Sequence, residues 1–329
     1  MGYKDHISKF DYVTASRQWI ARYKYMLRGK LKYMPTTWFR GKNTNFLPNK
    51  NDLYEVGGLE EFIFKGWLPD EPFIDKDTRI VAIGSCFAAE ISKYLIENNF
   101  TGILSKKSSG ELFKFPEGFG EGVNNTFAVR QLFEWAWINQ HPTTETWHRK
   151  DQTVIERNEK FQKETATRFK DTEVFIITLG LSEVWYDKET KDVFWRAIPL
   201  DQFDENKHAF RVSTVEENKN NIQAIIDLIT THSPTAKVIF TLSPVPLLAT
   251  FRPISCITAN SVSKSILRVA IDEIARDNSD KIYYWPSYEM VKEYAQNPYT
   301  DDNRHVKKSI TQEIMDNFVK YYTTNNIGL

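Results

Sequence analysis

The stretch RIVAIGSCFA, residues 79–88, decides the fold of this chain. Its first half, residues 79–83, is short, β-branched and apolar on both faces, which is typical of a buried strand in a parallel sheet. Gly84 then permits the tight turn by which a strand enters a helix. Apolar residues recur at helical spacing from Phe87 to Asn98. The stretch therefore predicts a strand, a turn and a helix in that order.

The same alternation continues to the end of the chain. Apolar runs predict further strands at 100–104, 173–178, 237–242 and 281–285. Helical periodicity predicts helices over 127–139, 215–231, 260–278 and 306–322. Residues 105–125, rich in Gly, Ser and Asn, predict a loop, and residues 186–213 a short hairpin plus a loop. Strands that alternate with helices favour an α/β fold whose parallel sheet is covered on both faces.

Composition narrows the class of protein. The 329 residues are 41% hydrophobic and 14% aromatic, which is enough for a sizeable core and excludes global disorder. No apolar run approaches the roughly 18–20 residues that cross a bilayer, and the start lacks the apolar core of a signal peptide. Two cysteines are too few for a disulfide framework. We therefore expect a cytoplasmic protein.

The formal net charge of zero hides an asymmetry. Residues 1–50 hold eleven Lys or Arg against two Asp. In residues 17–33 these cations alternate with aromatic and aliphatic side chains. This pattern is typical of a surface that contacts anionic lipid. We favour instead a basic helix that docks on the acidic remainder of the same protein. A net charge of zero argues against general nucleic-acid binding, so no nucleic-acid partner is expected.

The turn after the first strand carries candidate chemistry, because function gathers at the carboxyl ends of parallel strands. Cys86 would lie at a helix N-terminus, where partial positive charge and free N–H groups lower a thiol pKa and hold an oxyanion. Cys86 is therefore a candidate nucleophile, and Ser85 is its competitor. The alternative is a buried, inert cysteine.

A second candidate lies near the C-terminus, at Asp302-x-x-His305. His305 could take the proton of the nucleophile, and Asp302 could orient the imidazole and stabilise its cationic form. Asp301 is a rival for that second role. The alternative is that Asp302 or Asn303 caps a helix and that His305 is a surface residue.

This order of motifs resembles that of the SGNH (GDSL-like) hydrolases, and residues 84–88 spell the motif of their GSCFA branch. Stretches at 178–185, 243–246, 260–265 and 285–289 are also similar to that family. The resemblance covers roughly residues 75–325. It implies an SGNH/flavodoxin-like three-layer α/β/α sandwich with a central parallel sheet over residues 75–329. Residues 1–74 would form a basic N-terminal helical extension and connector.

The resemblance also assigns roles. SGNH enzymes use Gly-Asp-Ser at the first turn, with Ser as the nucleophile. Gly84, Ser85 and Cys86 match these three positions in order, which implies a cysteine nucleophile. The third block of the superfamily, Gly-x-Asn-Asp, supplies an Asn that donates to the oxyanion.

In this chain that third block reads Gly180-Leu181-Ser182-Glu183, so Ser182 would donate through its hydroxyl. The second block contributes a glycine donor, for which Gly120, Gly122 and Asn125 are candidates. Gly84, Gly180, Glu183 and Asn125 are thus expected at the oxyanion or substrate site.

Together these assignments predict acyl transfer through a thioester at Cys86, either to water as an esterase or to a hydroxyl as an O-acyltransferase. Relatives imply an acylated carbohydrate or glycan precursor as substrate. Acyl-CoA could be the donor, and no cofactor is otherwise required. Trp185 and Trp195 are candidates for sugar stacking. The alternative is an inactive binding or scaffold protein that acts through its basic N-terminal segment.

Other chemistries find no support. No paired His or Cys spacing indicates a metal site, and no glycine-rich loop indicates ATP or NAD. Cys256 is expected to pack before a helix, and Lys264 and Arg268 to lie on a solvated helix face. The oligomeric state is left open.

Overall fold

The computed structural model describes residues 24–27, 30–33, 45, 47–104, 123–149, 151–277 and 281–324. The chain divides into two units, residues 1–62 and residues 63–329. The second unit contains the central sheet and the candidate site.

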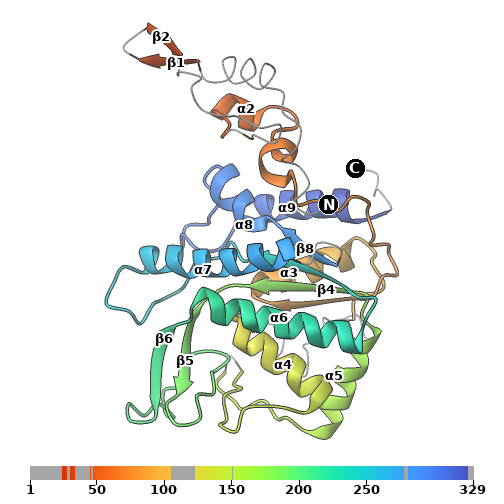
Figure 1. Ribbon diagram of the computed structural model, residues 1–329, viewed down its shortest axis with the longest axis vertical. Helices are drawn as coiled ribbons and strands as arrows, with labels where there is room; N and C mark the ends of the chain where they lie inside the picture. The colour runs from red at the N-terminus through yellow and green to blue at the C-terminus, as the bar shows by residue number, and fades with distance from the viewer. Residues whose placement is uncertain are drawn as a thin grey trace. The chain divides into compact units, whose positions relative to one another are not determined.

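Four parallel strands form the central sheet of the second unit (Figure 1). Their order is β3 (Ile80–Gly84), β4 (Val174–Leu179), β7 (Lys237–Leu242) and β8 (Ile282–Trp285). All six residues of β4 are buried, because helices cover both faces of the sheet. This explains why the strands read as uninterrupted apolar runs.

The strand predicted over residues 100–104 is reduced to a single parallel bridge between Ile103 and Ile80. The pairing is brief because the backbone N–H groups of Thr101 and Gly102 donate to the carbonyl oxygen of Lys76, at 2.7 and 3.4 Å. The bridge still adds a fifth position beside β3. The resulting order, second-first-third-fourth-fifth, is that of flavodoxin-like sheets, in which the site lies between the first and third strands.

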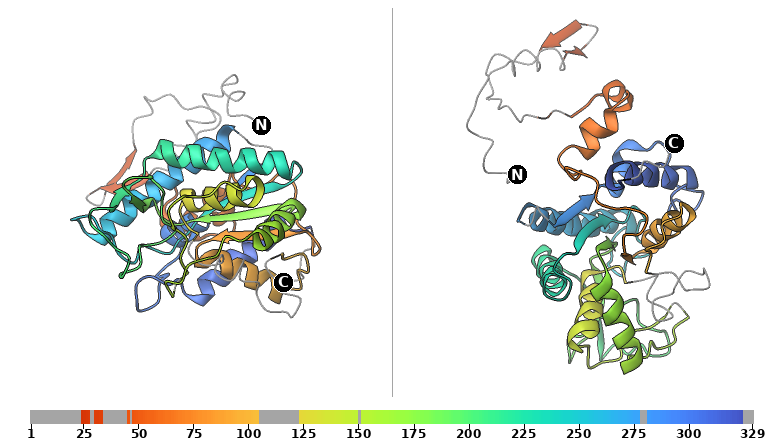
Figure 2. Two further views of the ribbon diagram at one scale, coloured as in Figure 1. Left: turned by 90° about the horizontal axis from the view of Figure 1, so that it is seen from below. Right: turned by 90° about the vertical axis from the view of Figure 1, so that its right-hand side faces the viewer.

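Helices cover the two faces of the sheet in separate layers (Figure 2). One face carries α3 (Cys86–Glu97) and α9 (Lys308–Tyr322), and the other carries α4 (Thr126–Ile138), α6 (Val215–His232) and α7 (Cys256–Asp277). These helices confirm the three-layer α/β/α architecture. The shorter elements of this part are α8 (Ser287–Glu289) and the π-helix η3 (Met290–Tyr294).

Helix α5 (Glu159–Asp171) packs against α4 and was not predicted. Only Thr165 and Phe169 of its 13 residues are buried. The apolar periodicity that reveals a helix in a sequence is therefore almost absent. Phe169 fixes α5 in place, with its ring centroid 4.7 Å from that of Phe133 on α4.

The predicted hairpin is present as β5 (Glu183–Asp187) paired with β6 (His208–Val212). Its first strand begins three residues before the predicted range of 186–213. It follows β4 directly in the chain, after a link of three residues from Gly180 to Ser182. The hairpin therefore projects from the carboxyl edge of the sheet, where it can form a wall of a site.

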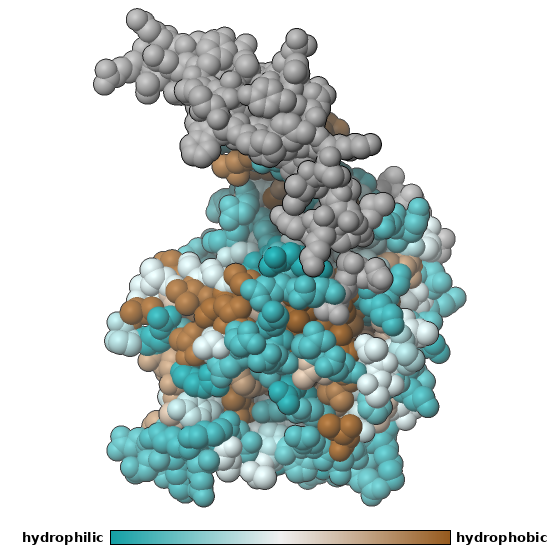
Figure 3. Space-filling view, in the orientation of Figure 1, coloured by the Kyte–Doolittle hydropathy of each residue, from teal (hydrophilic) through white to brown (hydrophobic). Residues whose placement is uncertain are grey.

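Helix α7 differs from its prediction at two points. It begins at Cys256 rather than Asn260, and Lys264 is only 1% exposed. The prediction that Lys264 lies on a solvated face is therefore wrong. Figure 3 shows a band of hydrophobic surface at the level of α7, whose exposed residues include Ile257 and Val262. Arg268 is also covered, because its guanidinium lies 4.2 Å from the ring centroid of Tyr284.

The N-terminal unit contains β1 (Lys24–Leu27), β2 (Lys30–Tyr33) and α2 (Lys50–Tyr54), and the π-helix η1 (Glu60–Phe64) follows. β1 and β2 pair in antiparallel fashion, with Leu27 opposite Lys30. The helix predicted here is therefore wrong for these eight residues. The reason is visible in the sequence, because polar and apolar residues alternate in Lys30–Tyr33 and Gly29 stands between the strands.

The rest of the segment from 17 to 33 lies outside the described residues. Its docking on the remainder of the protein, and the alternative contact with anionic lipid, therefore stay predictions. Within the described part of the chain, every helix is too short or too polar to span a bilayer.

Candidate active site

The turn after β3 places Ser85 and Cys86 at the carboxyl edge of the sheet. Gly84 has a φ of +134°, and a Cβ atom on it would lie 2.1 Å from the carbonyl oxygen of Thr178. Only glycine fits this approach between β3 and β4. Ser85 then caps α3, its Oγ accepting from the backbone N–H of Phe87 at 3.2 Å. Cys86 is the first residue of the helix, at the end where the helix dipole is positive.

The hydroxyl of Ser85 serves the helix rather than solvent. Ser85 is 5% exposed and lines the main cavity of this edge. An N-cap hydroxyl of this kind stabilises a helix by about 1 kcal/mol. The side chain of Cys86 lies outside the described residues, and so do Gly120 and Gly122. The assignment of Cys86 rather than Ser85 as the nucleophile therefore stays a prediction.

Asp302 and His305 are joined by a hydrogen bond between Asp302 Oδ2 and His305 Nδ1. The other carboxylate oxygen accepts the backbone N–H of His305 at 2.9 Å and that of Arg304 at 3.0 Å. The hydroxyl of Thr300 donates to the same oxygen at 2.7 Å. These donors, with the His305 N–H first, hold the pKa of Asp302 well below its ordinary range. The carboxylate is therefore ionised and fixed in place.

The helix-cap alternative for Asp302 does not fit the structure. Helix α9 begins only at Lys308, and Lys307 precedes it without a side-chain cap. Asp302 instead belongs to a loop closed by the bridge between Tyr299 and Val306. Among the described residues, Asp301 makes no hydrogen bond to His305.

The loop that carries His305 is tied to the exit of β7. Tyr299 donates its hydroxyl to the carbonyl oxygen of Pro244 at 3.2 Å, and Arg304 Nε donates to that of Pro246 at 3.1 Å. Arg304 lines the same cavity as Ser85. His305, the next residue in the chain, is not among the residues that line the cavity, and 59% of its side chain is exposed.

Ser182 does not reach the cavity, so the expectation that its hydroxyl holds an oxyanion is corrected. Its side chain is fully buried, and its Oγ donates to Ser263 Oγ of α7 at 3.3 Å. The backbone N–H of Ser182 donates to the same oxygen at 2.8 Å. Its carbonyl accepts from Ser213. Each polar group of Ser182 thus serves the core.

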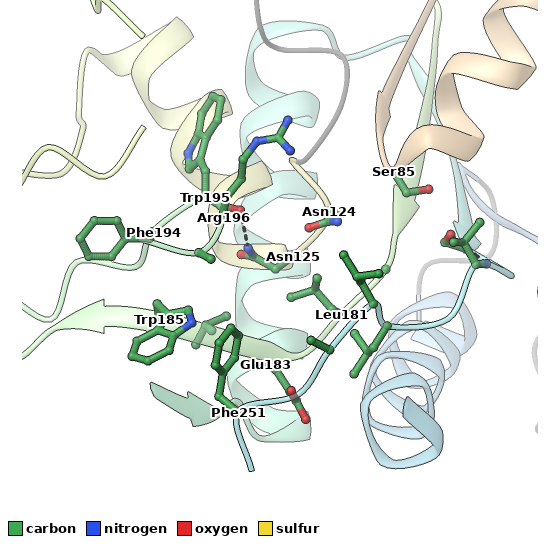
Figure 4. Close-up of a pocket in the computed structure, with 18 of the residues that line it drawn as sticks. Ser85, Asn124, Asn125, Leu181, Glu183, Trp185, Phe194, Trp195, Arg196 and Phe251 are labelled. Atoms are coloured by element: carbon green, nitrogen blue, oxygen red, sulfur yellow. Dashed lines mark hydrogen bonds between the residues drawn. The ribbon is translucent and has the colours of Figure 1, made fainter. Parts of the chain in front are cut away.

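Gly180, Glu183 and Asn125 all line the cavity. The Glu183 carboxylate accepts the hydroxyl of Thr250 at 2.8 Å and lies 3.9 Å from Arg252 Nη1. Asn125 caps α4, accepting the N–H of Ala128 at 2.9 Å through Oδ1. Its Nδ2 donates to the carbonyl of Trp195 at 3.4 Å, drawn as a dashed line in Figure 4. Asn125 is therefore occupied at both ends of its amide.

Asn124 is a cavity residue that the sequence reasoning missed. Its backbone carbonyl accepts the N–H of Gly180 at 2.7 Å, which joins the start of α4 to the exit of β4. Its side chain lies between Ser85 and Asn125 in Figure 4. Within the described part of the chain, this amide has no hydrogen-bond partner. The only sequence signal was its position beside Asn125, because the contact with Gly180 is tertiary.

The cavity has a volume of about 360 Å³ and an aromatic wall. Trp185 of β5 packs against Phe210 of β6 and Phe251, with ring centroids 5.3 and 4.9 Å apart. The buried Trp185 Nε1 has no hydrogen-bond partner among the described residues. Trp195 also lines the cavity, but it is 2% exposed and its Nε1 donates to Gln131 at 2.9 Å. Trp185 is thus the better placed of the two tryptophans to meet a ligand.

Two other expectations concern metals and Cys256. The described residues contain no group of three or more His, Cys, Asp or Glu side chains arranged to hold a metal ion. Cys256 is half-buried, with its Sγ 3.7 Å from the carbonyl oxygen of Leu247.

Several solved structures are similar to this chain at low identity. A GDSL-like lipase from Bacteroides thetaiotaomicron is 14% identical, with a TM-score of 0.38 over 75% of this chain and 88% of that chain. A family two carbohydrate esterase from Clostridium thermocellum, solved with cellohexaose, is 12% identical, with a TM-score of 0.33 over 77% of this chain and 64% of that one.

A structure from Streptococcus pneumonia named for platelet activating factor is 14% identical, with a TM-score of 0.28. It matches 46% of this chain, and the chain spans 60% of it. The chain therefore spans less than two thirds of two of these three relatives. No curated protein matches the sequence.

The model of the GSCFA family matches residues 79–318, from the first strand through most of α9. The match contains the turn at Gly84, the Gly180 block and the Asp302–His305 pair. The chain belongs to the GSCFA family.

Proposed function

We propose that this protein is an acyl-transfer enzyme, an esterase or O-acyltransferase, that works through a thioester at Cys86 with His305 as the base. The observation that carries the proposal is the hydrogen-bonded Asp302–His305 pair, held beside a cavity at the edge where α3 begins. Nucleophilic acyl transfer requires a nucleophile and a base oriented by an ionised carboxylate. The Asp302–His305 pair would supply the oriented base, and Cys86 at the start of α3 would supply the nucleophile.

In the proposed mechanism, His305 takes the proton of the Cys86 thiol, and the sulfur attacks the acyl carbonyl. Asp302 holds the imidazole by its Nδ1 and stabilises the imidazolium that forms. The carbonyl oxygen becomes an oxyanion as the C–S bond forms. His305 then returns the proton to the departing oxygen or thiol, which leaves the acyl group on Cys86.

The backbone N–H of Cys86 and the side-chain amide of Asn124 are the proposed oxyanion donors. Asn124 takes the role first expected of Ser182, because its amide has no hydrogen-bond partner among the described residues and borders the cavity. Such a donor contributes a factor of roughly 10²–10³ to the rate. Water or a sugar hydroxyl, deprotonated by His305, would then release the acyl group as an acid or a new ester.

The substrate class is part of the proposal. An acylated carbohydrate or glycan precursor fits a cavity that combines an aromatic wall at Trp185 and Phe251 with polar groups at Asn124 and Glu183. Aromatic faces that pack against sugar rings and polar groups that fix orientation are the usual features of such sites. Acyl-CoA is the proposed donor if the reaction is transfer, as in polysaccharide biosynthesis within the cytoplasm.

Intact-mass measurement after incubation with p-nitrophenyl acetate or acetyl-CoA tests the chemistry. We expect an acetyl adduct that is lost in Cys86→Ala and retained in Cys256→Ala, the matched control at the other cysteine. An adduct that survives Cys86→Ala but not Ser85→Ala would assign the nucleophile to Ser85. A wild-type protein that never acquires an adduct would refute the proposal and favour an inactive binding protein.

A further inference from the structure

Lys264 of α7 is a buried cation that the acyl-transfer mechanism above does not use. It is 1% exposed, and its Nζ donates to the carbonyl oxygens of Gly180 and Ser243, each at 2.7 Å. These are the first residues after β4 and β7. Burial of an ammonium is costly unless hydrogen bonds compensate it. Two carbonyl oxygens at this distance favour the charged form of the amine.

The ammonium is joined through the backbone to the turn that begins α3. Gly180, Ser243 and Ser85 line the same cavity. The backbone N–H of Ser85 donates to the carbonyl of Thr178, two residues before Gly180, at 3.2 Å. Ser243 in turn donates its N–H to the carbonyl of Leu179 at 2.8 Å. Lys264 therefore holds two strand exits that line the same cavity as Ser85, the residue before α3.

We propose that Lys264 is a positioning residue of the site, whose ammonium fixes the exits of β4 and β7 and whose charge stabilises the thiolate form of Cys86. A positive charge near a thiol favours the anion, and a buried charge is screened less by salt than an exposed one. Lys264 makes and breaks no bond in this role. The inference rests on the proposed function, because it takes Cys86 as the nucleophile.

Other charges face the same cavity. Glu183, Arg196 and Arg304 line it, and the Asp302–His305 pair belongs to the loop that carries Arg304. The negative charge of Glu183 opposes that of a thiolate, but the carboxylate is hydrogen-bonded to Thr250. All these groups are kept constant when variants at position 264 are compared with the parent protein.

The test measures the thiolate of Cys86 without any substrate. The parent is Cys256→Ser, in which Cys86 is the remaining cysteine. Its rate of alkylation by iodoacetamide is followed by intact mass between pH 5 and pH 10. In Lys264→Met, we expect the midpoint of this profile to rise by about one pH unit. This corresponds to alkylation roughly tenfold slower at pH 7.

Lys93→Met is the matched control, because it makes the same chemical change on α3 itself. Its side chain is 54% exposed and pairs with Glu97 at 4.0 Å, so its charge is screened by water. We expect its alkylation midpoint to equal that of the parent. If Lys264→Met does not fold, Lys264→Gln serves as the uncharged variant. Its amide can still donate a hydrogen bond to one of the two carbonyl oxygens.

The inference would be overturned if a folded Lys264→Met or Lys264→Gln protein had the same alkylation midpoint as the parent. It would also be overturned if the midpoint of the parent lay at or above the ordinary thiol pKa of about 8.5. A raised midpoint in Lys264→Met but not in Lys93→Met would support it. Failure of the proposed function has a different signature, namely the absence of an acetyl adduct on Cys86 in the wild-type protein. The two ideas can therefore fail separately.

Discussion

Replacement of Gly84 by alanine should cost the protein much of its stability, because two independent penalties act at this residue. The φ of +134° is a conformation that alanine rarely adopts, which costs about 1–3 kcal/mol. The new Cβ would also lie 2.1 Å from the carbonyl oxygen of Thr178, a backbone atom that cannot rotate away. Overpacking of this kind costs about 1–3 kcal/mol. We expect Gly84→Ala to lower the free energy of unfolding by about 4 kcal/mol.

Gly66→Ala separates the two penalties. Gly66 also has a positive φ, of +84°, but a Cβ atom there would meet no heavy atom within 4 Å. Only the conformational penalty of about 1 kcal/mol applies. Urea unfolding of the two variants, followed by tryptophan fluorescence, gives both values against the wild type. If the two losses agree within about 1 kcal/mol, the close approach of β3 and β4 is not what requires glycine, and the reasoning fails.

Three further predictions concern the edge of the sheet. Asn124→Ala should slow acetylation of Cys86 by roughly 10²–10³-fold, as measured from the burst in stopped flow. Ser182→Ala should leave that rate unchanged and cost about 1 kcal/mol of stability, as measured by urea unfolding. Asn125→Ala should cost about 1 kcal/mol through the lost cap of α4, and an unchanged unfolding curve would contradict this. The backbone N–H of His305 is the main cause of the lowered pKa of Asp302. The ionised carboxylate therefore stabilises the folded protein at pH values above the pKa of about 3.9 that Asp has in the unfolded chain, and this stabilisation is lost as the pH falls below that value. The difference in Tm between wild type and Asp302→Asn should accordingly shrink as the pH falls below about 4.

The sheet could be predicted from the sequence because its strands are buried on both faces. Each of β3, β4, β7 and β8 lies within two residues of its predicted range. Local spacing also sufficed for the Asp302–His305 contact, since both residues belong to one short loop. The strands and this contact are determined mainly by burial and by local geometry, and both leave a recognisable pattern in the sequence.

The rest depends on contacts between distant residues. Asn124 enters the cavity because its carbonyl binds the N–H of Gly180, 56 positions away in the sequence. Ser182 leaves it because Ser263 of α7 offers a hydroxyl inside the core. Helix α5 was not predicted for another reason. Only two of its residues are buried, so its sequence lacks the apolar periodicity of a helix.

The departures of this chain from the SGNH pattern are linked through two successive residues of α7. Ser263 accepts the N–H of Ser182 and draws that residue into the core, where it cannot face an oxyanion. Lys264, the next residue, holds the carbonyl of Gly180, whose own N–H is bound by Asn124. The same helix that removes the expected donor thus keeps the Gly180 backbone where it carries Asn124 to the cavity. If Asn124 holds the oxyanion as proposed, the site depends on α7 as well as on the strand exits, and the absence of Asn from residues 180–183 does not by itself remove it.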